Sequence, residues 1–144
     1  GKEGATAVRS GITATSVILT GLRNGTTYYF VVKAVNSHGS STASNEASAE
    51  PVAPPAAPGS LTATAGAGQV GLHWTPSAGA TGYAVYLGTR AGGESASADV
   101  TVLGNASGVT VSGLSKGTKY YFIVKATNKI GASTASNEAS ATPN

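Results

Sequence analysis

Short runs in which apolar and polar residues alternate recur along the chain, separated by glycine, asparagine and proline. Residues 69–74 place Val70, Leu72 and Trp74 on one side of an extended segment, and residues 83–87 alternate in the same way. A period of two is typical of strands with one buried face, and no helical period is present. The pattern predicts strands over 61–64, 69–74, 83–87, 99–102, 108–111, 119–128 and 133–141.

The later part of this pattern occurs twice. Residues 21–36 return as residues 113–128 with an offset of 92, so that Tyr28 matches Tyr120. From residue 17 to residue 51, 23 of the 35 aligned positions are identical. A repeat of this length is the size of a small domain, which is too long for the unit of a solenoid.

The repeat divides the chain into one whole domain and part of another. We expect 1–50 to be the C-terminal half of a domain, 51–57 to be a proline-rich, semi-rigid linker, and 58–144 to be a complete domain. The first part lacks any counterpart of Trp74, so its inward-facing side chains should lie exposed beside open strand edges. It is a fragment, is disordered, or is completed by another chain; alone, we expect it to be unfolded.

Composition narrows the classes of protein. Gly, Ala, Ser and Thr make up 80 of the 144 residues, charged residues 10%, and cysteine is absent. Disulfide scaffolds and cysteine-ligated metals are therefore excluded. The nine basic residues are dispersed and the net charge is +3, which argues against a nucleic-acid partner. Apolar runs are too short for membrane insertion.

Candidate catalytic groups are few. Asp99 is the only aspartate, and His38 and His73 lie far apart in the sequence. We recognise no carboxylate pair, no catalytic triad and no phosphate-binding loop. His73 should point outward from its strand, and the matched pair Glu46 and Glu138 should cap backbone groups or place a charge on an edge strand. We therefore predict no enzyme activity and no catalytic, cofactor-binding or metal-binding residue.

The order of the large residues resembles the fibronectin type III domain family. The matching features are Leu-His-Trp before Pro76, Gly-Tyr-Ala-Val-Tyr at 82–86, Leu114 six residues ahead of Tyr120, and a run from Phe122 that ends in Ser-Asn-Glu at 136–138. The resemblance implies an all-β, immunoglobulin-like antiparallel sandwich of seven strands. It also implies that Trp74 is the core tryptophan and that Leu114 and Tyr120 form a tyrosine corner. The predicted structural core is Trp74, Tyr83, Leu114, Tyr120 and Phe122, with Leu22, Tyr28 and Phe30 in the partial copy.

One surface group combines aromatic and basic side chains. If Tyr83 faces inward, alternation turns Tyr86 outward, and the same argument turns Tyr121, Ile123 and Lys125 outward. In a type III domain the two strands are neighbours, so Tyr86 and Tyr121 should stand side by side. Such a pair can stabilise the sheet, contact another protein or domain, or stack on sugar rings.

The resemblance is to type III modules of bacterial secreted enzymes and surface proteins. It implies a non-catalytic extracellular spacer or interaction module of a multidomain protein, such as a carbohydrate-active enzyme, with the neighbouring domains as partners and no cofactor. One alternative is a structural subunit of a fibre, in which other copies of the chain complete the first domain. A further alternative is weak polysaccharide binding through Tyr86 and Tyr121.

Overall fold

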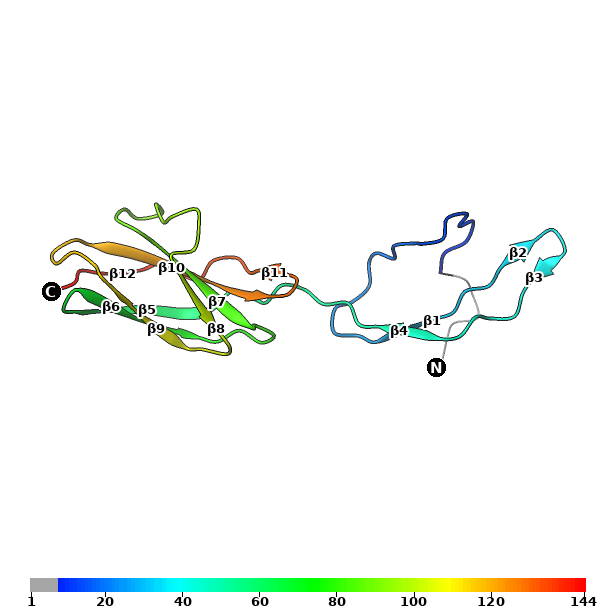
Figure 1. Cartoon of the computed structure of the whole chain (residues 1–144), viewed down its shortest axis with the longest axis horizontal. Coiled ribbons are helices and arrows are strands. Elements are labelled where there is room, and N and C mark those ends of the chain that lie inside the picture. Colours follow the sequence, from blue (N-terminus) through cyan, green and yellow to red (C-terminus); the bar gives the residue numbers. More distant parts are fainter. Residues whose placement is uncertain (1–7) are drawn as a thin grey trace. The chain divides into compact units, whose positions relative to one another are not determined.

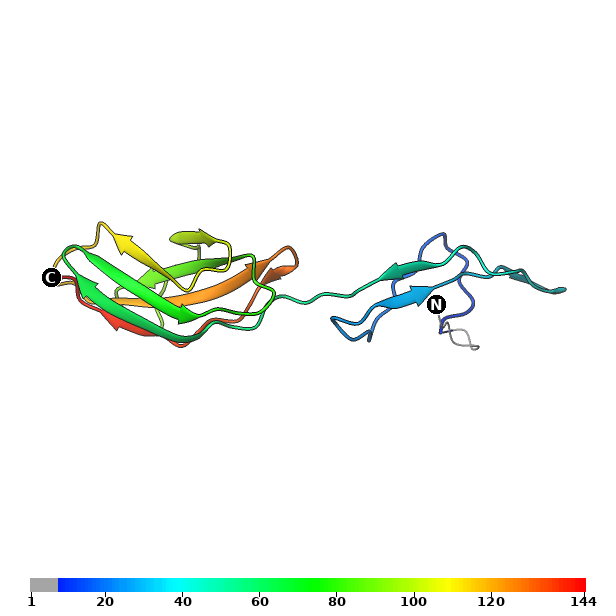
Figure 2. The same cartoon turned by 90° about the horizontal axis from the view of Figure 1, so that it is seen from below.

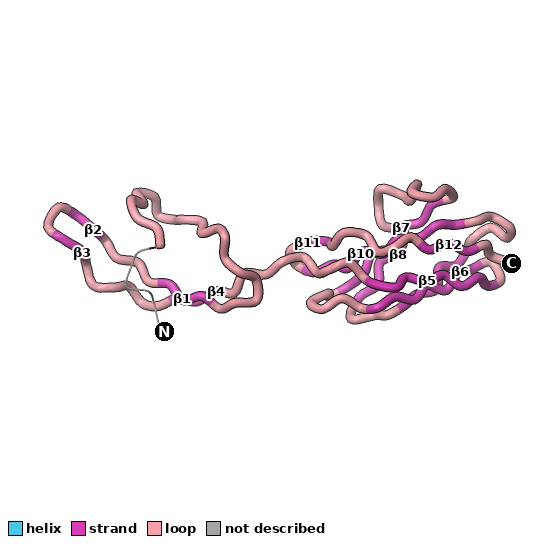
Figure 3. The backbone as a smooth tube through the Cα atoms, turned by 180° about the vertical axis from the view of Figure 1, so that it is seen from behind, coloured by secondary structure: helices cyan, strands magenta, loops and turns pink. Residues whose placement is uncertain are grey.

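The computed structural model describes residues 8–144, and these fall into two compact units that divide between Val52 and Ala53. Figure 3 shows strands and loops throughout the described chain and no helix. The described residues accordingly contain no helix long and apolar enough to cross a membrane. Most of the strand structure belongs to the second unit.

The second unit is a sandwich of two antiparallel sheets (Figure 2). Its strands are β5 (Gly59–Gly66), β6 (Gln69–Thr75), β7 (Gly82–Gly88), β8 (Val100–Leu103), β9 (Gly108–Ser112), β10 (Tyr120–Asn128), β11 (Gly131–Ala132) and β12 (Ala139–Ala141). One sheet has the order β5-β6-β9. The other has the order β11-β10-β7-β8, and β12 also pairs with β10. The predicted all-β sandwich is confirmed.

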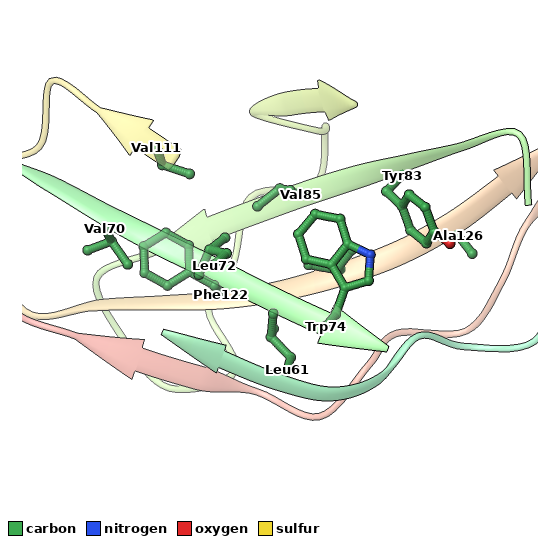
Figure 4. Packing of buried hydrophobic residues seen from close by; sticks show 10 residues of the cluster. Leu61, Val70, Leu72, Trp74, Tyr83, Val85, Val111, Phe122 and Ala126 are labelled. Atoms are coloured by element: carbon green, nitrogen blue, oxygen red, sulfur yellow. The ribbon is translucent and has the colours of Figure 1, made fainter. Parts of the chain in front are cut away.

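Alternation along the strands builds the core between the sheets, as Figure 4 shows. The aromatic rings of Trp74 and Tyr83 pack against each other within it, with their centroids 5.2 Å apart. Tyr83 is fully buried and its hydroxyl accepts a hydrogen bond from Ser77 N at 2.9 Å. Phe122 and Val124 of β10 belong to the same sheet as Tyr83 and are also fully buried. Burial of these large side chains provides the main driving force for folding of a chain otherwise rich in small residues.

The last predicted strand, 133–141, differs from the structure because serine hydroxyls interrupt it. Only β12 is a strand there, and β11 precedes it. In between, the Ser133 and Ser136 hydroxyls accept hydrogen bonds from the Ala126 and Val124 amides, at 2.9 and 3.0 Å. A hydroxyl that takes the place of a backbone carbonyl breaks the ladder but still satisfies the buried amide of β10. The unit therefore has eight strands rather than seven: β12 is the shortened form of the predicted strand, and β11 is an additional strand before it.

The described part of the first unit contains four short strands, labelled in Figure 1: β1 (Tyr28–Phe30), β2 (Val35–Asn36), β3 (Gly39–Ser40) and β4 (Ala47–Ala49). They repeat the pairings of the second unit at the same offset of 92. Tyr28 pairs with Ala49 as Tyr120 pairs with Ala141. The hydrogen bond from a backbone amide to a serine hydroxyl recurs as well: Val32 N donates to Ser44 Oγ at 3.0 Å.

Two segments of the first unit match strands of the second unit but are not strands themselves. Residues 8–11 correspond to β8, and residues 16–20 correspond to β9. In the second unit β8 pairs only with β7, and β9 pairs only with β6. The described part of the first unit has no counterpart of β6 or β7, so these segments have no partner. The strands that do form are those whose partners lie within the same unit.

The lack of counterparts of β5, β6 and β7 also changes the burial of the predicted core residues. In the second unit Trp74, Tyr83 and Phe122 are buried, whereas Leu114 and Tyr120 are half-buried. In the first unit Leu22, Tyr28 and Phe30 are all half-buried, since the described residues include no counterparts of β5, β6 and β7.

The proline-rich segment is divided between the two units. The boundary falls between Val52 and Ala53, so that residues 53–57 of the expected linker are grouped with the second unit. Asn128 Nδ2 donates to Ala53 O at 2.8 Å, and Pro55 is buried. The side-chain amide of Asn128 thus attaches Ala53, the first residue of the second unit, to the end of β10.

Candidate interaction surfaces

The outer face of the five-stranded sheet carries the aromatic and basic group predicted from alternation. Antiparallel pairing of β7 with β10 sets Tyr86 opposite Ile123 and Tyr121 opposite Gly88. The two tyrosines therefore lie on the same face as diagonal neighbours, because Tyr121 pairs with the residue two positions after Tyr86. All four residues of the predicted group, Tyr86, Tyr121, Ile123 and Lys125, are half-buried.

A lysine lies over each of the two tyrosine rings. Lys125 Nζ is 5.0 Å from the centroid of Tyr86, and Lys119 Nζ is 5.2 Å from the centroid of Tyr121. Both distances are within the range of a cation–π contact. The ammonium groups take up ring faces that a sugar would need for stacking, so the geometry favours cross-strand stabilisation of the sheet. The sequence predicted that Lys125 faces outward on this surface, but it did not predict Lys119 as a member of the group or the placement of an ammonium group over each ring.

The histidines do not converge with other polar groups. His73 is exposed on β6, as alternation predicts. His38 lies in the turn between β2 and β3, where its Nδ1 is 3.2 Å from Ser37 Oγ of the adjacent residue. Across residues 8–144, no group of three or more His, Asp or Glu side chains is placed to hold a metal ion.

The structure brings together a pair of carboxyl groups, and the expectation of no carboxylate pair was wrong. Glu94, in the loop after β7, lies beside Glu138, just before β12. Burial raises the pKa of Glu94, and the neighbouring Glu138 carboxyl raises that pKa further, against the lowering effect of a backbone hydrogen bond. Glu138 Oε2 also accepts a hydrogen bond from Gly92 N at 2.7 Å. The two glutamates are 44 positions apart in the sequence, and no local pattern links them.

The contacts of this pair attach a loop to the sandwich. A third carboxylate, Asp99, also holds this loop: its Oδ2 accepts hydrogen bonds from Leu87 N at 2.8 Å and from the Ser95 hydroxyl. Backbone bonds from Ser95 N to Leu87 O and from Asp99 N to Val85 O complete the connection, at 3.0 and 2.8 Å. These contacts fold the loop over residues 88–99 back onto β7, and they assign Glu138 the backbone-capping role expected for it.

The family relationship follows from this sandwich together with a sequence match. The family model described as "Fibronectin type III domain" matches residues 2–50 and 56–142. The chain belongs to the fibronectin type III domain family. Consistent with this, Ser115 N donates to the Tyr120 hydroxyl at 3.2 Å, which is the contact of a tyrosine corner. In the first unit Arg23 N donates to the Tyr28 hydroxyl in the same way, at 3.0 Å.

Two similar proteins place this fibronectin type III chain among bacterial relatives. It is 36% identical over 142 residues to Chitinase A1 of Niallia circulans, a match that covers 90% of this chain and 19% of that protein. The chain thus corresponds to less than a fifth of that relative. A crystal structure of an Fn3-like protein from Clostridium thermocellum superposes with a TM-score of 0.55 at 28% identity, covering 64% of this chain and 96% of that one.

Proposed function

We propose that the chain is a non-catalytic spacer and interaction module of a secreted or cell-surface bacterial multidomain protein that acts on carbohydrate. The observation that carries this proposal is the match to Chitinase A1, which takes in nearly the whole of this chain but only 19% of that protein. Fibronectin type III domains are generally accessory modules without catalytic activity. A proline-rich segment that leads into a closed sandwich suits the task of setting the distance between other domains.

The outer face of the second unit supports a structural role over a sugar-binding one. A polysaccharide-binding surface needs flat aromatic faces open to the ligand, whereas Tyr86 and Tyr121 each lie under a lysine. A cross-strand group of this kind stabilises the sheet by about 0.2–1 kcal/mol per pair. The neighbouring domains of the parent protein are accordingly the partners we assign to the module.

Assays of chitin binding and of chitin hydrolysis, both with the whole chain, test this proposed function. We expect no release of sugar from insoluble chitin, and retention no greater than that of a charge-matched unrelated protein. A sugar-releasing activity that co-purifies with the chain would contradict the proposal that the module is non-catalytic. Retention that is lost in the Tyr86→Ala/Tyr121→Ala variant, but kept in Tyr29→Ala on the other unit, would replace the spacer with a polysaccharide-binding module.

A further inference from the structure

The loop that follows β7 in the second unit has two parts, and they are held in different ways. Residues 95–99 continue the pairing of β8 along one edge of β7, through the backbone hydrogen bonds described above. Residues 89–94, which we call the strap, contain a tight turn that is closed by a hydrogen bond from Gly93 N to Arg90 O at 3.1 Å. The strap is therefore a separate lobe of the loop, with its own contacts to the sandwich.

The strap lies on the outer face of the five-stranded sheet. Gly88 faces outward at the end of β7, and a Cβ atom at this position would overlap with Gly93 O. Gly92 N donates a hydrogen bond to Glu138 Oε2 at 2.7 Å, and Glu138 precedes β12, which lies on the far side of β10 from β7. The strap and the Glu138 side chain together span β10 at the level of Tyr121, because Tyr121 pairs with Gly88.

Two glutamates fasten the strap, and they need one proton to do so. Glu94 belongs to the strap and is half-buried, and its Oε1 is buried without a hydrogen-bond partner among the described residues. Its carboxyl group also contacts the carboxyl group of Glu138. A protonated carboxyl donates a strong hydrogen bond to a carboxylate, whereas two carboxylates at this separation repel each other. With one proton, Glu138 accepts hydrogen bonds from both Glu94 and Gly92; without it, a partly buried charge faces a like charge.

The other charged groups nearby do not relieve this repulsion. Burial and then the Glu138 carboxyl raise the pKa of Glu94, and Glu138 is the only charged side chain of the described chain that contributes to this shift. The remaining titratable side chains of the loop, of β7 and of β10 with the turn before it are Arg90, Asp99, Tyr83, Tyr86, Lys119, Tyr120, Tyr121 and Lys125. The two lysines lie over tyrosine rings, and Asp99 accepts hydrogen bonds at the edge of β7. Within residues 8–144, no cation is therefore placed to neutralise Glu94 when it loses its proton.

We propose that the strap is an acid-closed cover over the outer face of the five-stranded sheet, fastened by one proton between Glu94 and Glu138 and released when that proton is lost. Residues 95–99 remain bonded to β7, so the strap moves about its ends while the core stays packed. Release uncovers the side of Tyr121 that the closed strap faces, and Tyr121 is half-buried in the closed form. The change at the switch is thus a single charge, and the element that responds is a surface loop. This inference stands independently of the spacer function.

Hydrogen exchange of the Gly92 amide, in the whole chain labelled with ¹⁵N, tests the strap directly. A raised pKa stabilises the closed form at low pH, and this stabilisation is lost as pH rises through the raised value. Protection of the Gly92 amide, corrected for the intrinsic pH dependence of exchange, should therefore fall several-fold between about pH 4 and pH 7. Ring signals of Tyr121 should shift with the same midpoint, and those of Tyr29 on the other unit should not. Constant protection of Gly92 would overturn the proposal, and so would an equal loss of protection throughout β7 and β10, which would mean unfolding of the unit.

Two substitutions at Glu94 separate the effect of the proton from that of the loop. Glu94→Gln keeps a hydrogen-bond donor of similar size that carries no charge, so the protection of Gly92 should stay high up to neutral pH. Glu94→Lys introduces the residue that the first copy has at the matching position, Lys2, and should also stay closed because its ammonium group can pair with the Glu138 carboxylate. Glu46→Gln, at the position that matches Glu138 in the other unit, is the control and should keep the pH profile of the parent. Exchange of the β7 and β10 amides shows in each variant that the unit is folded. A fall in protection in Glu94→Gln equal to that of the parent would place the titrating group elsewhere and overturn the proposal.

Discussion

Val124 and Val32 occupy equivalent positions, and their substitution by alanine should have very different costs. Val124 is fully buried in the sandwich core, whereas Val32 is 70% exposed. Removing two buried methyl groups costs about 1.6 kcal/mol of transfer free energy, and the cavity left behind brings the cost to roughly 2–3 kcal/mol. At Val32 most of that surface is already in water, so we expect a cost of about 0.5 kcal/mol or less.

The single tryptophan makes the second unit easy to follow. Trp74 is 2% exposed in that unit, so its fluorescence reports urea unfolding of the second unit alone. For a domain of this size a loss of 2–3 kcal/mol lowers the melting temperature by roughly 10–20 °C. The Val32→Ala variant should leave the fluorescence transition in place and change only hydrogen exchange in β1 and β4. A Val124→Ala variant that unfolds within about 0.5 kcal/mol of the parent would refute this reasoning about the core.

Three further substitutions test single contacts. Ser133→Ala leaves the buried Ala126 amide without its acceptor and should lower the stability of the second unit by about 1–3 kcal/mol in urea unfolding. Tyr120→Phe removes the hydroxyl that accepts a backbone amide five residues earlier, and by the same assay should cost about 1 kcal/mol. The raised pKa of Glu94 means that its contribution to stability is greatest below the pKa of the unfolded chain and is lost as pH rises through the higher folded value. Glu94→Gln, which removes repulsion from Glu138, should flatten this pH dependence in melting curves recorded between acid and neutral pH.

The strands and the core could be predicted because they depend on local alternation. Trp74, Tyr83 and Phe122 each stand at the inward position of a strand whose period is visible in the sequence. Alternation also turned Tyr86 and Tyr121 to one outer face. It did not give the register between β7 and β10, which sets the two rings diagonally and places a lysine over each.

The carboxyl pair was beyond prediction for a different reason. Glu94 and Glu138 meet because a loop after β7 folds back over β10 toward β12. That path is held by contacts such as the hydrogen bond from Gly92 N to the Glu138 carboxylate. The alternation of apolar and polar residues carries no information about such contacts. The splitting of the last strand has a similar origin, since alternation counts serine as polar and does not show that its hydroxyl replaces a carbonyl.

The two copies of one segment separate what local sequence decides from what the surroundings decide. Residues 41–49 and 133–141 are identical, and both use serine hydroxyls to accept amides of the neighbouring strand, at 2.9–3.0 Å. Ser133 is nevertheless buried, whereas Ser41 is exposed. Register and hydroxyl bonding therefore come from the segment itself, and burial comes from the layer that covers it. An exposed amide can bond to water when its hydroxyl is removed, so Ser41→Ala should cost about 0.5 kcal/mol or less where Ser133→Ala costs several times as much. Equal costs at the two serines would mean that the first unit is already covered in the free chain.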